Sequence, residues 1–262
     1  MRTALLELML LAAAGGLLGA WIVLRRLAFF SHAVGSATFP GLVLAEATSF
    51  SPRLAALAVA LGYAGGVERV GRRARDPGDT ATGLLLVAAL AFGVVLAADV
   101  FSSGGGVDRL LFGSLVGLDG SDVAFSALAA ALAVTATALL GRAWTAVAFD
   151  PEGAGALGLP LARVDLLLLG LIAVASVAAL PAVGALLVTS LFVVPAATAR
   201  LIVDSVRGLL LLSVAVAAVQ SLVGLYLALW LDTPPGPVVA ALGGCMYAAA
   251  ALATAGGTRS TA

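Results

Sequence analysis

The run LLELMLLAAAGGLLGAWIVL, from Leu5 to Leu24, decides the fold class of this chain. A helix needs about 20 predominantly apolar residues to cross the hydrocarbon core of a bilayer, and this run is close to that length. Arg25 and Arg26 follow directly and resemble the basic stop at the end of a span. A charged start before an apolar run is also typical of a signal peptide, but the length and the arginine pair favour a first membrane span.

The composition of the whole chain extends this interpretation beyond the first run. Of its 262 residues, 62% are hydrophobic and 11% charged, whereas a soluble domain is about half apolar and a quarter charged. A water-soluble core cannot hide that excess, so we expect an all-α bundle that crosses a membrane several times. The net charge of zero does not indicate a nucleic-acid partner, and the lone Cys245 excludes a disulfide framework.

Nine apolar runs separated by breaks predict nine helices within one transmembrane domain, residues 1–262, that ends in a short tail, 256–262. The second and third runs are short and are either tilted or half-spanning, so a bundle with eight crossings is an alternative to one with nine. The nine runs are Leu5–Leu24, Ala33–Thr48, Leu54–Val67, Thr80–Ala98, Val123–Leu140, Leu166–Leu180, Val183–Ala199, Leu209–Leu231 and Val238–Ala253.

The arginines predict the orientation, because basic residues gather on the cytoplasmic side of a membrane protein. The loop Glu68–Asp79 holds four of them, so we expect it in the cytoplasm. Alternating crossings then leave only Arg2, Arg53 and Arg109 outside, out of 14 basic residues. With nine crossings the N-terminus is outside and the C-terminus inside; with eight, the N-terminus moves inside.

The long loop Asp99–Asp122, on the outer side, contains more sequence features than a simple connection needs. Its apolar stretch Leu110–Leu118 is too short to span, and it is either a surface segment or a re-entrant piece that lines a cavity. Asp99, Asp108 and Asp122 are solvated, cap a helix, or help to receive a cation.

The inner loop, Arg142–Arg163, contains the signals of a short helix. Asp150 is a typical N-cap, Pro151 suits the first helical position, and Glu152 favours the positive end of the helix dipole. Gly158 would end it. We expect a surface helix within about residues 149–160 that either connects two spans or docks another protein.

Three stretches in this order resemble one family: FDPEGAGALGLP at 149–160, VGALLVTSLFVVPAATAR at Val183–Arg200, and DTPPGP at Asp232–Pro237. They resemble the permease subunits of the ATP-binding cassette importers for zinc, manganese and iron, the ABC-3 type. The resemblance runs from about Gly15 to the last span. The vitamin B12 and siderophore permeases have a related layout.

The resemblance implies a permease in the inner (plasma) membrane of a prokaryote, working by alternating access as a homodimer. An external binding protein would deliver the zinc, manganese or iron ion, and two ATPase subunits would bind the ATP. This chain would bind no cofactor, and it has no GxxxxGK[ST] loop for ATP. The ATPase would grip the inner helix through six residues: Asp150, Pro151, Glu152, Gly155, Leu157 and Gly158.

The candidate metal residues lie in the second run. Aligned on Pro40 and Gly41, His32 stands where the family has aspartate, and Ser36 stands where it has histidine. A spacing of four keeps both on one helix face. A neutral imidazole is a good zinc ligand and acceptable for manganese or iron, whereas serine is a poor ligand and is expected only to line the path. If His32 is not a ligand, it caps the helix or lies in the interface. Glu46 is either a boundary residue or an oxygen ligand or gate at the outer mouth.

Four residues are candidates for gating or for the pathway wall: Pro40, Gly41, Pro195 and Arg200. Pro195 removes a backbone hydrogen bond, and in a membrane the freed carbonyl needs a partner, so we expect Pro195 to face the bundle or a cavity, either as part of the pathway or as a packing kink. The missing acid and histidine pair leaves a metal chelate or other organic cargo open. A secondary transporter would need more buried acids, and an intramembrane protease would need more than one histidine.

Overall fold

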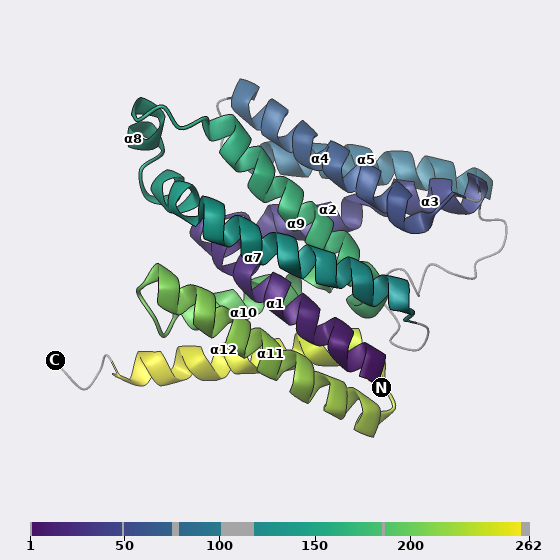
Figure 1. Ribbon diagram of the computed structural model, residues 1–262. Coiled ribbons are helices and arrows are strands. Elements are labelled where there is room, and N and C mark those ends of the chain that lie inside the picture. The colour runs from purple at the N-terminus through teal and green to yellow at the C-terminus, as the bar shows by residue number, and fades with distance from the viewer. Residues whose placement is uncertain (1, 49, 75–78, 101–117, 185–186, 258–262) are drawn as a thin grey trace.

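Helices make up nearly all of the part of the chain that the structure describes. The structure is a computed structural model, and it describes every residue except 1, 49, 75–78, 101–117, 185–186 and 258–262. Figure 1 shows the long helices side by side. In chain order they are α1 (Arg2–Leu24), α2 (Ala28–Ala37), α3 (Phe39–Thr48), α4 (Pro52–Ala74), α5 (Asp79–Val100), α7 (Gly120–Phe149), α8 (Pro151–Ala156), α9 (Leu161–Val183), α10 (Val188–Arg200), α11 (Val206–Leu231) and α12 (Pro235–Gly257).

Among the described residues, 8 helical segments are long and apolar enough to cross a membrane. One of them, Ala28–Thr48, consists of α2 and α3 together, whereas α10, with 13 residues, is too short. At 1.5 Å per residue α10 is roughly 20 Å long, against a hydrocarbon core of about 30 Å. The expected bundle of eight to nine helices is confirmed, with α10 as the short ninth segment.

Two expectations about helix length are wrong. The third apolar run is not a short helix, because α4 has 23 residues and continues well past Val67. The fifth run does not stop at Leu140, because α7 continues to Phe149. Trp144 explains the second extension: it is fully buried, its ring lies 5.3 Å from that of Trp21, and its indole N–H donates to the Val164 carbonyl at 3.2 Å.

The two ends of the bundle differ in what they carry. Figure 1 shows α8 and the C-terminus at one end, called here the α8 end, and the N-terminus at the other, the N-terminal end. Leu24, at the finish of α1, shares an apolar cluster with Ala199 and Val203, so α10 brings the chain back to the α8 end. This is the alternation that nine segments predict, with the two termini at opposite ends.

Glycines on α1 let this central helix approach two neighbours closely. A Cβ on Gly15 would lie 2.9 Å from Phe192 Cε1 of α10, and a Cβ on Gly19 would collide with the Phe192 carbonyl oxygen. On the adjoining face, a Cβ on Gly16 would lie 2.7 Å from the backbone nitrogen of Val214 in α11. Small residues at these positions therefore fix how α1 packs, as is common in membrane bundles.

Helices α2 to α5 form one flank of the bundle, and α10 to α12 form the other, with α1, α7 and α9 between them (Figure 1). Of the arginine loop, Arg75 lies outside the described residues, as do Asp108, Arg109, Arg259, almost all of the stretch Leu110–Leu118, and the tail from residue 258.

Candidate functional site

His32 lies where the two flanks meet. It is half-buried on α2, and its Nδ1 lies 3.4 Å from the Thr189 hydroxyl in the first turn of α10. Ser36 lies one turn further along α2 and is also half-buried. The contact with Thr189 was not predicted from the sequence, because it joins residues 157 positions apart.

A break in the helix follows this pair at Thr38, whose hydroxyl donates to the Gly35 carbonyl at 2.6 Å. Pro40, which has no N–H, is the second residue of the next helix, α3, and is buried. Gly41 packs directly on α4, since a Cβ there would lie 2.7 Å from the Ala55 carbonyl oxygen. Both expected pathway residues of this run therefore lie at the joint between α2 and α3.

The fold does not place Glu46 close to His32. It is exposed in the last turn of α3, and the fourteen positions between them correspond to roughly 21 Å along helix at 1.5 Å per residue. No group of three or more His, Cys, Asp or Glu side chains suited to a metal occurs within the described ranges. The polar side chain that the structure places beside His32 is the Thr189 hydroxyl.

On α10, the two other expected pathway residues have different surroundings. Pro195 is buried inside the helix and leaves the Leu191 carbonyl without its usual donor, on the side that packs against Gly15 of α1. Arg200 is exposed at the α8 end, where its Nη1 donates to the Val203 carbonyl at 3.5 Å. Pro195 therefore faces the bundle, as its sequence context predicted, while Arg200 caps a chain turn.

The surface helix α8 has the predicted construction. The Asp150 carboxylate accepts a hydrogen bond from the Gly153 N–H at 2.9 Å, and Pro151 takes the first helical position. Gly158 has a φ of 81°, the left-handed conformation that favours glycine after a helix. Glu152 and Gly155 are exposed, and Leu157 is 85% exposed. The helix thus presents an apolar side chain to water at the α8 end.

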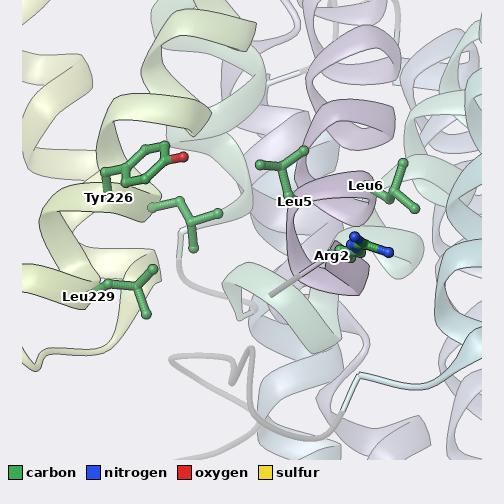
Figure 2. Close-up of a pocket in the computed structure, with 6 residues that line it drawn as sticks. Arg2, Leu5, Leu6, Tyr226 and Leu229 are labelled. Carbon is green, nitrogen blue, oxygen red and sulfur yellow. The ribbon is translucent and has the colours of Figure 1, made fainter.

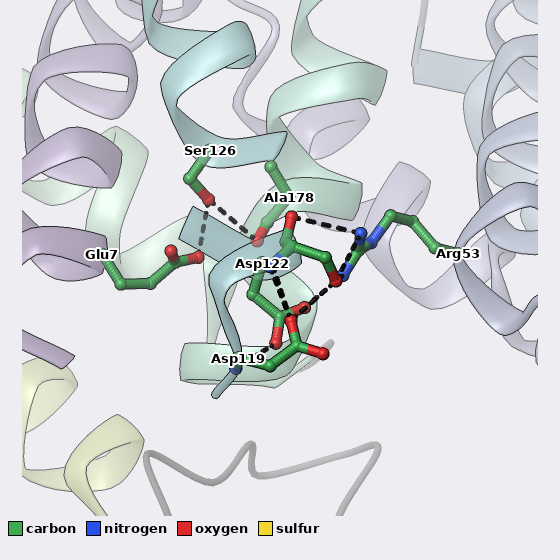
Figure 3. Close-up of polar contacts among 7 residues, drawn as sticks. Glu7, Arg53, Asp119, Asp122, Ser126 and Ala178 are labelled. Atoms are coloured by element: carbon green, nitrogen blue, oxygen red, sulfur yellow. Dashed lines mark hydrogen bonds and ion pairs between the residues drawn. The ribbon is translucent and has the colours of Figure 1, made fainter. Parts of the chain in front are cut away.

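At the N-terminal end, a polar network ties α4 to α7 (Figure 3). Arg53 forms an ion pair with Asp122, and its guanidinium lies over the Phe125 ring at 5.4 Å. Asp119 caps α7, and the hydrogen bond from the Ser121 hydroxyl lowers the pKa of its carboxyl. Asp122 is thus partnered rather than free to receive a cation, and Glu7 of α1 lies beside the network.

An apolar groove opens between α1 and α11, also at the N-terminal end (Figure 2). It has a volume of about 330 Å³. Its lining is Arg2, Leu5, Leu6, Leu225, Tyr226 and Leu229. Its lining includes no carboxylate or imidazole, the side chains that bind divalent transition metals best.

Comparison with known proteins agrees with this architecture. The solved structure of PsaBC from Streptococcus pneumoniae in complex with Fab superposes with a TM-score of 0.82 at 24% identity, covering 95% of this chain and 90% of that one. An inward-facing conformation of a putative metal-chelate type ABC transporter gives a TM-score of 0.68 at 17% identity, covering 94% and 84%. At these identities the likeness shows a shared fold.

Sequence comparison shows the family of the chain as well as its fold. The manganese transport system membrane protein MntC of Listeria innocua is 27% identical over 226 residues, which cover 86% of this chain and 80% of the relative. The chelated iron transport system membrane protein YfeC of Yersinia pestis is 28% identical over 225 residues, covering 86% and 76%. The sequence model of the ABC 3 transport family matches residues 1–254, and the chain therefore belongs to that family.

Proposed function

We propose that this chain is the membrane-spanning permease subunit of an ATP-driven importer for a divalent transition metal ion: manganese, zinc or iron. The observation that carries the proposal is the family match over residues 1–254, nearly the whole chain. The manganese and iron systems of the relatives support a metal cargo. His32 supports it too, because a half-buried imidazole beside a hydroxyl can bind such an ion weakly enough to release it.

The most direct test is ATP hydrolysis by the complex reconstituted in liposomes with its ATPase and binding protein. We expect hydrolysis to rise when the binding protein is loaded with one of manganese, zinc, iron or cobalt. Equal hydrolysis with loaded and empty binding protein for every metal would count against metal import.

The partners follow from the same proposal. A second copy of the chain would complete the pathway, and one ATPase subunit would dock on α8 of each copy, within the coupling segment 149–160. The exposed Leu157 and the well-capped Asp150 turn support this docking role, because a rigid helix with an apolar contact transmits movement efficiently. The binding protein would dock at the N-terminal end.

We place the α8 end in the cytoplasm of a prokaryote and the N-terminal end outside its inner membrane. Arg69, Arg72 and Arg73 lie near the C-terminal end of α4, at the α8 end, in line with the positive-inside rule. With Cys245 replaced by serine, a cysteine at Arg72 should react with an impermeant maleimide only after the membrane is opened. A cysteine at Glu46 should react in intact cells; the reverse pattern would overturn the topology.

Substituting His32 tests the metal site. We expect His32→Ala to lower metal uptake about tenfold or more, as loss of a metal-site contact commonly does, and Thr189→Val to lower it less. Uptake of radioactive manganese or zinc by cells that express the full complex measures both. Glu46→Gln is the matched control, because that exposed acid lies far from His32. Unchanged uptake in His32→Ala would remove His32 as a ligand.

A chelate cargo is the second candidate. The described residues contain no cluster of three strong ligands, and the system that includes YfeC is named for chelated iron. A chelate carries its own ligands and needs few from the protein. Uptake of a metal chelate that is unaffected by His32→Ala, together with no uptake of the free ion, would favour this candidate.

A further inference from the structure

A fully buried carboxyl on α1 has no role in the function proposed above. Glu7 is 0% exposed, and one of its oxygens accepts a hydrogen bond from the Ser126 hydroxyl of α7 at 2.6 Å. The other, Oε2, is buried and has no hydrogen-bond partner among the described residues. The Ser126 hydroxyl lies 3.5 Å from the Ala178 carbonyl oxygen of α9. Figure 3 shows the three oxygen-bearing groups converging from three helices.

Within the described ranges, no basic side chain forms an ion pair with the Glu7 carboxylate. The charged groups that act on it are Asp122 of α7 and Arg53 of α4, and these two are paired with each other. A carboxylate inside a membrane bundle is strongly disfavoured unless a positive charge joins it, so such residues are functional candidates by default. A proton or a metal cation can supply that charge.

We propose that Glu7, Ser126 and the Ala178 carbonyl form an oxygen-only site for a hard divalent cation such as Mn²⁺, at the N-terminal end of the bundle. Carboxylate, hydroxyl and carbonyl oxygens are the donors that such ions prefer, and water would complete the shell. Asp122 precedes Ser126 by one turn on the same face of α7 and adds negative potential. The inference rests on the proposed function, in which the ion enters at this end and passes His32 later.

The test is Mn²⁺ binding to the purified transporter complex without ATP or binding protein, followed by the electron paramagnetic resonance signal of free Mn²⁺. Glu7→Gln has the same size and still accepts the bond from Ser126, and we expect it to weaken binding at this site at least tenfold. Ser126→Ala should weaken it several-fold. Ser176→Ala is the matched control and should bind like the original chain, because it also removes a buried hydroxyl, one on α9 that has no hydrogen-bond partner among the described residues. His32→Ala should keep this site.

An unchanged binding curve in Glu7→Gln, with an unchanged melting temperature, would overturn the site. If Glu7→Gln does not fold, an unchanged curve in Ser126→Ala overturns it instead. Anomalous scattering from Mn²⁺-soaked crystals gives an independent answer, since the site requires a peak beside Glu7. If the original complex imports manganese but Glu7→Gln binds it normally, only this site fails. If the original complex imports no metal, the proposed function fails.

Discussion

Replacing Leu157 with aspartate is expected to abolish co-purification of the ATPase subunit with this chain. Leu157 is 85% exposed at the end of α8, and Phe149, just before α8, is 65% exposed. Apolar anchors at the centre of an interface often cost about 2 kcal/mol or more when they are lost, and a buried charge in their place adds to that cost. The chain itself should still fold, because little of the Leu157 side chain packs on it.

Pull-down of the ATPase from detergent-solubilised membranes measures this loss. Ile202→Asp is the matched control, since Ile202 is also a large exposed apolar residue, 57% exposed, in the turn after α10 rather than on α8. Deleting residues 151–158 should give the same loss as Leu157→Asp. An intact complex after that deletion would show that the ATPase docks elsewhere.

Replacing Gly19 with alanine is expected to destabilise the bundle by about 1–3 kcal/mol, the usual cost of overpacking. The added Cβ would collide with the Phe192 carbonyl oxygen and lie 3.2 Å from the Ala196 Cβ. Because the colliding atom belongs to the backbone of α10, no side-chain rotation relieves the contact. The whole α1–α10 interface must shift, so transport should fall together with the melting temperature.

Gly62→Ala provides the comparison for that experiment. Gly62 lies within α4, and a Cβ there would meet nothing within 4 Å. Alanine is a better helix former than glycine by about 1 kcal/mol, so this variant should melt at the same temperature or higher. Equal melting temperatures for Gly19→Ala and Gly62→Ala in the same detergent would contradict the close packing of α1 on α10.

The spans and α8 could be predicted because their signals are local. An apolar run is driven into the membrane wherever its neighbours lie, and Asp150–Pro151 starts a helix through the Asp150 carboxylate and the fixed backbone angle of proline. The errors came where tertiary packing overrides local composition. Arg142 and Trp144 indicated a loop, yet they continue α7 because Trp144 is buried against Trp21 and bonded to Val164.

The site residues that were missed depend on contacts between distant segments. Thr189 is one of three hydroxyl residues in the mostly apolar α10, and its contact with His32 follows from how α2 and α10 pack. Glu7 is one acid within a run of apolar residues, so it changes the mean hydropathy of that run very little. Its importance emerges only when three helices enclose it. A single acid in a first span is the signal that could have singled it out.

The start of α10 has an electrical consequence for an idle transporter. Val188 is fully buried, and the helix has no side-chain cap at its beginning, so the positive end of its dipole, equivalent to roughly half a charge, lies inside the bundle. In the proposed transport path, a cation beside Thr189 would therefore be repelled by the dipole of α10. Such repulsion would shorten the time that a cation spends at this position, and it would oppose a leak of small cations through the proposed transporter while no ATP is being hydrolysed.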